Sequence, residues 1–280
     1  MFSIQGEPYK VSEARQHVLE AFEDLEFYED GHRYLLHGRQ LPSVSSIGHR
    51  YLRYPFDEQR QAAIYAEKHG KTAEHWIRQW HCNSFRATTL GTKTHEFGES
   101  LAYQLAGHPE LIRPQIRIQY NEEYNYLAPI HPKEMAVERF LTELPPTLHL
   151  VLNETKVYSG KNPDASLNLK EQICGTFDML YWYDGDGMEE RSGFVVMDYK
   201  TNASLCNDYS RRFNRVLLEP FHNMYEEDFS LYVIQLNLYA LMLEDIGLPV
   251  IARRIVWLKD DGTYELFDTP DISDLLRQHL

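Results

Sequence analysis

Cysteine is scarce in this chain. Only three cysteines occur among its 280 residues, Cys82, Cys174 and Cys206. Their spacings match neither a zinc knuckle nor a framework of disulfides. We expect all three to be free thiols in a reducing compartment.

Long apolar runs are also missing. No hydrophobic stretch approaches the roughly 18 residues that a membrane span needs. The N-terminal segment MFSIQGEPYKVSEARQ has neither the apolar core of a signal peptide nor an arginine-rich transit pattern. We therefore expect an intracellular, cytoplasmic protein with no membrane partner.

Positive charge is in deficit as well. The chain has 28 Lys and Arg against 42 Asp and Glu, so its formal net charge is −14. Such a charge opposes a broad basic surface that holds nucleic acid. Any contact with nucleic acid must therefore be local, or must be assisted by metal ions.

The rest of the composition is ordinary for a globular protein, with 43% hydrophobic and 25% charged residues. No repeat, low-complexity tract or linker rich in Gly, Ser or Pro divides the chain. We predict one compact unit, in which residues 1–90 form a hairpin and helical region and residues 91–280 form the core.

Helical patterns dominate the first half of the chain. SEARQHVLEAFEDLEF reads as a helix capped by Ser12, and HRYLLHGRQLPSVSSI as a short hairpin followed by a helix start. Residues 56–82 carry apolar and aromatic positions at helical spacing. Further helices are predicted to begin near TTLGTKTHEFG and near HPKEMAVERF.

The middle of the chain changes to strand patterns. LHLVLNETKVYS, EQICGTFDMLYWYDGDG and SGFVVMDYKTN are rich in β-branched and aromatic residues, and DGDG is a hairpin turn signal. A polar segment, a long helix ending at Gly247, the strands VIARRIVWL and TYELFD, and a terminal helix follow. The fold class is therefore α/β, or an elaborated α+β, with a central mixed β-sheet flanked by helices.

Two acids and a lysine lie on the two strands that the DGDG turn connects. Asp198 and Lys200 are two residues apart in a strand, so their side chains project from the same face. The turn lies near the midpoint between Asp178 and Asp198, which brings these carboxylates opposite or nearly opposite each other. Paired carboxylates repel unless a proton or a divalent cation separates them, and their oxygens suit magnesium or manganese. The hairpin predicts a metal site, although surface ion pairs and turn-flanking acids are the alternative explanation.

Other polar residues complete a series. Glu154 stands on the neighbouring predicted strand, His95 stands near a predicted helix N-terminus, and Gln235 and Tyr239 share one helix face. The order G-x-x-x-H, E, G-x-x-D, D-x-K and Q-x-x-x-Y resembles the motif series of the RecB-like branch of the PD-(D/E)XK nucleases. The resemblance covers roughly residues 91–239.

This resemblance implies a restriction-endonuclease-like core and metal-dependent hydrolysis of DNA in replication, recombination or repair. The PSVSS segment is similar to one ahead of the core in the mitochondrial genome maintenance exonuclease family and its phage and bacterial relatives, with Ser45 in place of the usual threonine. Some RecB-like nucleases hold an iron–sulfur cluster with four cysteines. Three cysteines cannot supply that cluster, so we expect none.

The resemblance also assigns a metal-binding set. Asp178 and Asp198 would bind Mg²⁺ or Mn²⁺, joined by His95 and by the backbone carbonyl of Tyr199. An imidazole ligand among oxygens shifts the preference towards manganese.

The remaining motif residues receive catalytic roles from the same resemblance. Lys200 would stabilise charge on the phosphate or position and deprotonate the attacking water. Glu154 would orient a metal-bound water or a second ion. Gln235 and Tyr239 would hold the substrate backbone or brace the lysine by hydrogen bonds.

Two segments are candidates for DNA contacts. YSRRFNRV places Arg211, Arg212 and Arg215 after the catalytic strand, either as a phosphate-binding patch or as a solvated loop. HWIRQWHCNSFRATT interleaves aromatic and basic residues as a surface for stacking single-stranded bases would, but its spacing equally fits core packing. The residues in question there are Trp76, Trp80, Phe85 and Arg86.

Three functions are compatible with these patterns. The favoured one is an exonuclease that threads a free single-stranded DNA end beneath an arch formed by residues 56–85, with a helicase or recombination protein as an allowed partner. A structure-selective or restriction-like endonuclease on the same core is the nearest alternative. A non-catalytic nucleic-acid-binding protein on a nuclease fold is the third.

Overall fold

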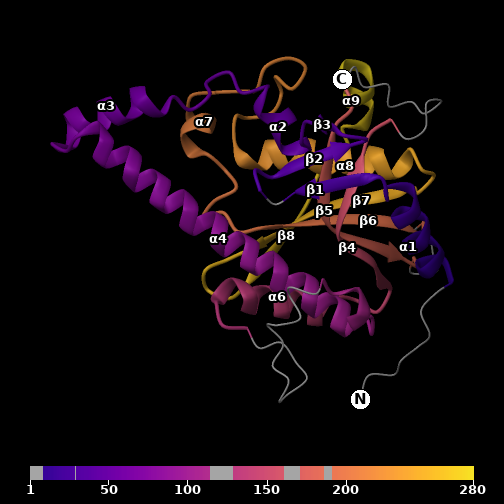
Figure 1. Cartoon of the computed structure of the whole chain (residues 1–280). Helices are drawn as coiled ribbons and strands as arrows, with labels where there is room; N and C mark the ends of the chain where they lie inside the picture. Colours follow the sequence, from indigo (N-terminus) through magenta and orange to yellow (C-terminus); the bar gives the residue numbers. More distant parts are fainter. Residues whose placement is uncertain (1–8, 29, 114–128, 161–170, 186–190) are drawn as a thin grey trace.

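A five-stranded mixed sheet forms the centre of the protein (Figure 1). The computed structural model describes residues 9–28, 30–113, 129–160, 171–185 and 191–280. In the sheet, β4 to β6 are antiparallel neighbours, β6 and β7 are parallel, and β8 is antiparallel to β7. The strands are β4 (Leu148–Tyr158), β5 (Cys174–Tyr183), β6 (Gly193–Lys200), β7 (Val250–Leu258) and β8 (Tyr264–Asp268). The predicted mixed α/β class is confirmed.

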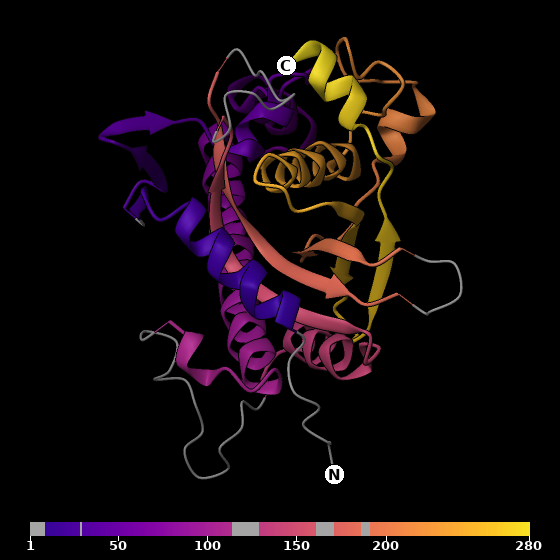
Figure 2. The same cartoon turned by 90° about the vertical axis from the view of Figure 1, so that its right-hand side faces the viewer.

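The sheet separates two hydrophobic cores. Along β6, Val195 and Met197 point into one core and Phe194 and Val196 into the other, as strand alternation requires. Figure 2 shows helix α8 (Asp228–Glu244) on one side of the curved sheet and α6 (Pro132–Glu143) on the other. Both faces are therefore covered, as in other layered α/β folds.

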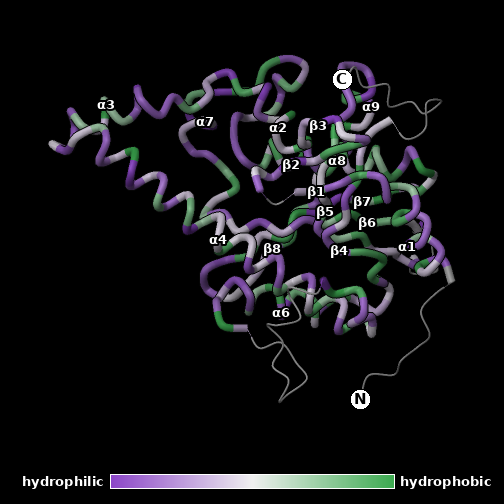
Figure 3. Tube along the Cα trace, in the orientation of Figure 1, coloured by the Kyte–Doolittle hydropathy of each residue, from purple (hydrophilic) through white to green (hydrophobic). Residues whose placement is uncertain are grey.

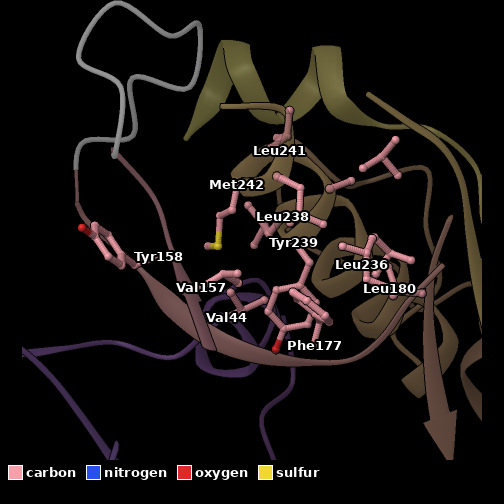
Figure 4. Close-up of a cluster of buried hydrophobic side chains, with 14 of the residues drawn as sticks. Val44, Val157, Tyr158, Phe177, Leu180, Leu236, Leu238, Tyr239, Leu241 and Met242 are labelled. Atoms are coloured by element: carbon pink, nitrogen blue, oxygen red, sulfur yellow. The ribbon is translucent and has the colours of Figure 1, made fainter. Parts of the chain in front are cut away.

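Helix α8 is apolar nearly all round. Its side chains from Leu236 to Leu243 are all buried, which is the pattern of a helix enclosed on every side. It packs against β7, α2 (Val44–His49) and α9 (Ser273–His279). Figure 4 shows Leu238, Tyr239 and Met242 of this helix in one hydrophobic cluster with Phe177 of β5. Figure 3 colours much of the strands as hydrophobic.

Helix α4 (Ala73–Leu105) is one uninterrupted helix of 33 residues. The prediction that a new helix begins near TTLGTKTHEFG was wrong, because no proline interrupts the segment and its glycines continue the helix. The second half packs on the sheet, with Phe97 and Leu101 buried. The first half projects from the body with α3 (Glu58–His69), after a turn at Gly70 in the left-handed conformation (Figure 1). His95 therefore lies in the middle of a helix, not near its N-terminus.

The N-terminal region differs partly from its prediction. Helix α1 (Tyr9–Ala21) begins before Ser12, so this residue lies inside the helix and does not cap it. The end of the predicted helix is instead the strand β1 (Leu25–Tyr28), because pairing with the next strand outweighs local helix propensity. The predicted hairpin is confirmed as β2 (Arg33–Leu36) and β3 (Arg39–Leu41), followed by α2 with Ser43 at its N-cap.

The remaining elements follow the predicted order. Helix α6 starts with a capping box formed by His131 and Glu134, and a short α7 (Asp208–Arg212) interrupts the polar segment after β6. Helix α8 ends at Glu244, before Gly247, and a single 3₁₀ turn, η1 (Pro109–Leu111), follows α4. The second half of the DGDG turn, Asp186 and Gly187, lies outside the described residues. In the described chain, no helix is long and apolar enough to cross a membrane.

The N-terminal region and the core are structurally continuous. The suggested division at residue 91 falls inside α4. Helix α1 also covers the free edge of β4, where the Arg15 guanidinium donates hydrogen bonds to the carbonyls of Leu150 and Val151 at 3.2 and 2.8 Å. Covering an edge strand with a helix is one way in which proteins protect it from pairing with another chain.

Alanine substitutions at two glycines of α4 should have different effects on stability. A Cβ on Gly98 would lie 2.8 Å from the buried ring of Tyr199, so Gly98→Ala should lower the free energy of unfolding by about 1–3 kcal/mol. A Cβ on Gly91 would lie 3.5 Å from the Thr201 hydroxyl, an ordinary contact. Gly91→Ala should therefore be neutral, or stabilise the helix by up to about 1 kcal/mol. Urea denaturation measures both, and equal effects would contradict the proposed packing of α4 on β6.

Candidate metal site

The site lies where β5 and β6 stop pairing. Met179 and Met197 form the last paired residues of the two strands, and the next positions are Asp178 and Asp198. Beyond that point the Asp178 carboxylate accepts a hydrogen bond from the backbone N–H of Tyr199 at 2.7 Å, in place of a strand–strand bond. The two acids thus come opposite each other, as the turn spacing predicted. Because the strands separate here, helices from both faces of the sheet can reach the gap.

One group of side chains converges from three elements. The His95 Nδ1 atom of α4 lies 3.2 Å from Glu154 Oε1 of β4 and 3.3 Å from Asp178 Oδ2 of β5. The three ligand atoms all lie within 4.8 Å of one another. The Asp178 side chain is only 8% exposed, and the other two are largely covered. Two carboxylates and an imidazole in this arrangement could hold a divalent metal ion.

Glu154 has an unusual backbone. It lies between two residues of β4 that pair with β5, Asn153 and Thr155, but its φ of +46° lies in the left-handed region that a non-glycine residue rarely adopts. The neighbouring Asn153 is held from α4, because its N–H donates to the Tyr103 hydroxyl at 2.8 Å and its carbonyl accepts from the same hydroxyl at 3.2 Å. Strain of this kind persists where the surroundings fix it, and it is concentrated at functional sites. Here it directs the Glu154 carboxylate towards His95.

A second group surrounds Lys200. Its ammonium forms an ion pair with Asp198, which is 1% exposed and whose other oxygen accepts from the Gln235 amide at 3.2 Å. The ammonium also lies 4.0 Å from the centroid of the Tyr232 ring, a cation–π contact. Asp198 thus contacts Lys200 and Gln235. The group that could hold a metal contains Glu154 as its second carboxylate, whereas the sequence analysis had assigned that ligand role to Asp198.

Tyr232 was missed by the sequence analysis. It lies on α8 one turn before Gln235, a position that reads as one more aromatic residue of an apolar helix. Its hydroxyl donates to Asn202 at 2.8 Å, and the Asn202 amide donates to Asp228 at 2.6 Å. The same asparagine accepts from the Trp257 indole through its backbone carbonyl at 2.8 Å. This network fixes the ring that faces the lysine.

Two further motif residues have packing roles in the structure. Tyr239 is 4% exposed, and its hydroxyl would lie 2.7 Å from a Cβ on Gly175, so it fits against β5 only because that residue is glycine. Tyr199 is also buried, with its ring edge-on to His95 at 5.9 Å. Neither side chain faces solvent, and Gln235 contacts the acid of the D-x-K motif, not its lysine.

Charges in the cluster are mutually dependent. Burial lowers the pKa of His95, but the charges and hydrogen bonds of Asp178 and Glu154 outweigh burial and raise that pKa well above its ordinary value. Burial raises the pKa of Asp178, but His95 and Lys200 outweigh it and hold the pKa below its usual range. Without an ion, a protonated imidazole therefore balances the carboxylates.

The second acid behaves differently. Burial and then the negative charge of Asp178 raise the pKa of Asp198 to about 6. Burial lowers the pKa of Lys200, but the negative charges of Asp198 and Asp178 outweigh burial and raise that pKa, so the lysine stays protonated. The carboxylates of Asp178 and Asp198 thus differ in their affinity for a proton. Acidic side chains outnumber basic ones at the site, which favours a bound cation.

The arginines of the segment after β6 are largely neutralised. Arg211 pairs with the buried Glu227 at 2.8 Å and Arg215 with the buried Glu226 at 3.1 Å. Arg212 makes no ion pair with any residue that the structure describes. The sequence could not reveal these pairings, which depend on the tertiary fold.

The aromatic residues at the start of α4 lie in the projecting helical hairpin. Trp76 and Trp80 each contact the Tyr65 ring of α3 at 5.4 Å, and Trp80 also contacts Phe56 at 5.5 Å. These contacts hold α3 to α4, which is the packing alternative of the sequence analysis. Phe85 and Arg86 lie further along α4 and are exposed.

Comparison with known proteins adds no relative. No protein-family model matches the chain, and no curated protein matches it significantly. A functional assignment therefore depends on the site itself.

We expect a divalent ion to stabilise the protein through this cluster. At an ion concentration 100 times the dissociation constant, the free energy of unfolding should rise by about 2.7 kcal/mol. Asp178→Asn removes a ligand charge but keeps an acceptor for the Tyr199 N–H, and it should abolish the rise in melting temperature. Manganese should bind at least as tightly as magnesium, because one ligand is an imidazole.

The matched control is Asp184→Asn. Asp184 forms another His–Asp pair, with His149 at 2.6 Å, next to the opposite end of β5. This variant should keep the full ion-induced shift in thermal denaturation. Equal stabilisation of Asp178→Asn and wild type by the ions would exclude the cluster as the binding site.

Proposed function

We propose that the protein is a metal-dependent DNA exonuclease with a restriction-endonuclease-like core of the RecB-like PD-(D/E)XK type. One observation carries the proposal: the cluster of His95, Glu154 and Asp178 lies at the same strand fork as the Asp198–Lys200 pair. Hydrolysis of a phosphodiester needs an activated water and positive charge near the phosphate. Those two groups of side chains are suited to supply both.

The donor set fits a magnesium or manganese ion. His95, Glu154 and Asp178 offer one nitrogen and two carboxylate oxygens within 4.8 Å of one another, and hard oxygen donors suit these ions. When bound, the ion would lower the pKa of the attacking water and polarise the phosphate. No cysteine belongs to this cluster, so an iron–sulfur cluster has no part in the proposal.

Residues of the chain itself would place positive charge beside the reacting phosphate. Lys200 carries its proton and presents positive charge where negative charge develops on the phosphate. Asp198 orients that ammonium from one side, and the Tyr232 ring limits it from another. Gln235 holds Asp198 in turn. Water would attack phosphorus in line as the bond to the leaving oxygen breaks.

Single-stranded DNA with a free end is the proposed substrate. The net charge of −14 produces a repulsive field, and a duplex has a higher charge density than a single strand. The first half of α4 projects from the body together with α3, and the second half of the same helix carries His95 (Figure 1). A strand guided along this projection would enter the site end first.

Substitutions at the site should remove cleavage without unfolding the protein. Asp178→Asn, Asp198→Asn and Lys200→Met should each lower the rate of DNA hydrolysis by about 10²–10³-fold or more, as expected when one charge-stabilising group is lost. The measurement is release of nucleotides from end-labelled single-stranded DNA in manganese, with circular dichroism as the folding check. Asp184→Asn should act at the wild-type rate. Wild-type turnover in Asp198→Asn would overturn the assignment of that residue.

The requirement for an end predicts substrate selectivity. Linear single strands should be degraded, blunt duplex should be a poor substrate, and circular single strands should survive. Gel analysis of the three substrates under identical conditions measures this. Rapid cutting of the circular strand would favour the endonuclease alternative on the same core.

A further inference from the structure

Exposed aromatic rings and arginine side chains contact one another on one surface. The residues lie in the segment before α3 and in or just after α7, and we refer to them as the aromatic–arginine patch: Tyr54, Tyr209, Arg212, Phe213 and Arg215. Tyr54, Tyr209 and Phe213 are 57%, 58% and 57% exposed. Single exposed rings are common, but three rings that contact guanidinium groups form a continuous surface suited to binding.

The five residues of the patch form a connected series of contacts between rings and guanidinium groups. The Arg215 guanidinium lies 4.2 Å from the Tyr54 ring centroid and 5.5 Å from that of Tyr209. The Tyr209 ring lies 4.6 Å from the Phe213 ring, and the Arg212 guanidinium lies 5.5 Å from Phe213. Planar groups of both kinds, aromatic and guanidinium, can stack on nucleobases.

A buried carboxylate holds this surface in place. Glu226 is 6% exposed, accepts a hydrogen bond from the Tyr54 backbone N–H at 2.7 Å and pairs with Arg215 at 3.1 Å. The Asn207 side chain caps α7 by accepting from the Tyr209 N–H at 3.1 Å. The rings thus project from a backbone that is fixed at both segments, so little ordering would accompany binding.

We propose that the aromatic–arginine patch binds single-stranded nucleic acid by stacking its bases. Unpaired bases expose their faces, whereas the bases of a duplex are already stacked on each other. Arg212 makes no ion pair with the described residues, so its charge is available to a phosphate in an otherwise acidic protein. Residues 201–207 connect Lys200 to α7, which makes the patch continuous in the chain with the candidate site.

The proposal rests on the proposed nuclease function for its purpose, but binding can be measured separately from cleavage. The full-length protein is mixed with a fluorescein-labelled oligothymidylate in excess chelator, and fluorescence anisotropy gives the dissociation constant. Tyr209→Leu and Phe213→Leu should each weaken binding about tenfold, the order of one lost base stack. Tyr209→Phe should bind as wild type, because the ring is kept.

A matched control and a second probe separate stacking from other causes. Tyr28 is 44% exposed on β1, outside the patch, so Tyr28→Leu should leave the affinity unchanged. An abasic strand has the same phosphates without bases. Wild type should prefer the normal strand to the abasic one, and Tyr209→Leu should lose most of that preference. Arg212→Gln should instead lower the salt dependence of binding, by about one unit of the log–log slope.

The outcomes are distinguishable. Wild-type affinity in both leucine variants, or equal loss of affinity for normal and abasic strands, would overturn the stacking proposal, as would a wild type that binds no single strand. If Tyr209→Leu dissociates a dimer in sedimentation without changing oligonucleotide affinity, the patch is an interface between copies of this chain. If the protein cleaves DNA but the leucine variants bind single strands as tightly as wild type, the patch proposal fails and the nuclease proposal stands. If binding depends on the rings but no divalent ion supports cleavage, the nuclease proposal fails and the patch proposal stands.

Discussion

The separation of β5 from β6 determines where every group of the candidate site lies. Pairing ends at Met179 and Met197, and the Asp178 carboxylate takes over the Tyr199 N–H that a continuing strand would have used. This hydrogen bond satisfies the buried Tyr199 N–H, so the end of strand pairing leaves no unpaired donor there. It also places Asp178 within reach of His95 on α4 and Asp198 within reach of Gln235 on α8.

The two layers contribute different chemistry. Helix α4 brings His95 to the side where Asp178 and Glu154 form a group that could hold a metal, while α8 places Tyr232 and Gln235 around Lys200 and Asp198. Glycine permits this close approach, since the Gly98 position of α4 lies against the Tyr199 ring. A rigid helix on each side lets small polar groups keep their positions in a gap that would otherwise relax.

Much of this arrangement was readable in the sequence, and the reasons for the failures are physical. Alternating β-branched residues predicted the strands, and the DGDG turn predicted that Asp178 and Asp198 meet. Continuity of α4 was missed, because a glycine inside a helix and a glycine ahead of a new helix look alike locally. Tyr232 resembled any core aromatic residue, and the neutralisation of Arg215 by Glu226 arises from long-range folding. Local signals locate the acids, whereas the partners of each charge depend on tertiary structure.

The central claim is that His95, Glu154 and Asp178 together bind one divalent ion. The most direct test is anomalous X-ray diffraction from crystals of the wild-type protein grown with manganese. The account predicts a manganese peak within bonding distance of the His95 imidazole and the Glu154 and Asp178 carboxylates, at the fork between β5 and β6. Well-diffracting crystals with no anomalous peak there at saturating manganese, or with manganese only at another site, would contradict it.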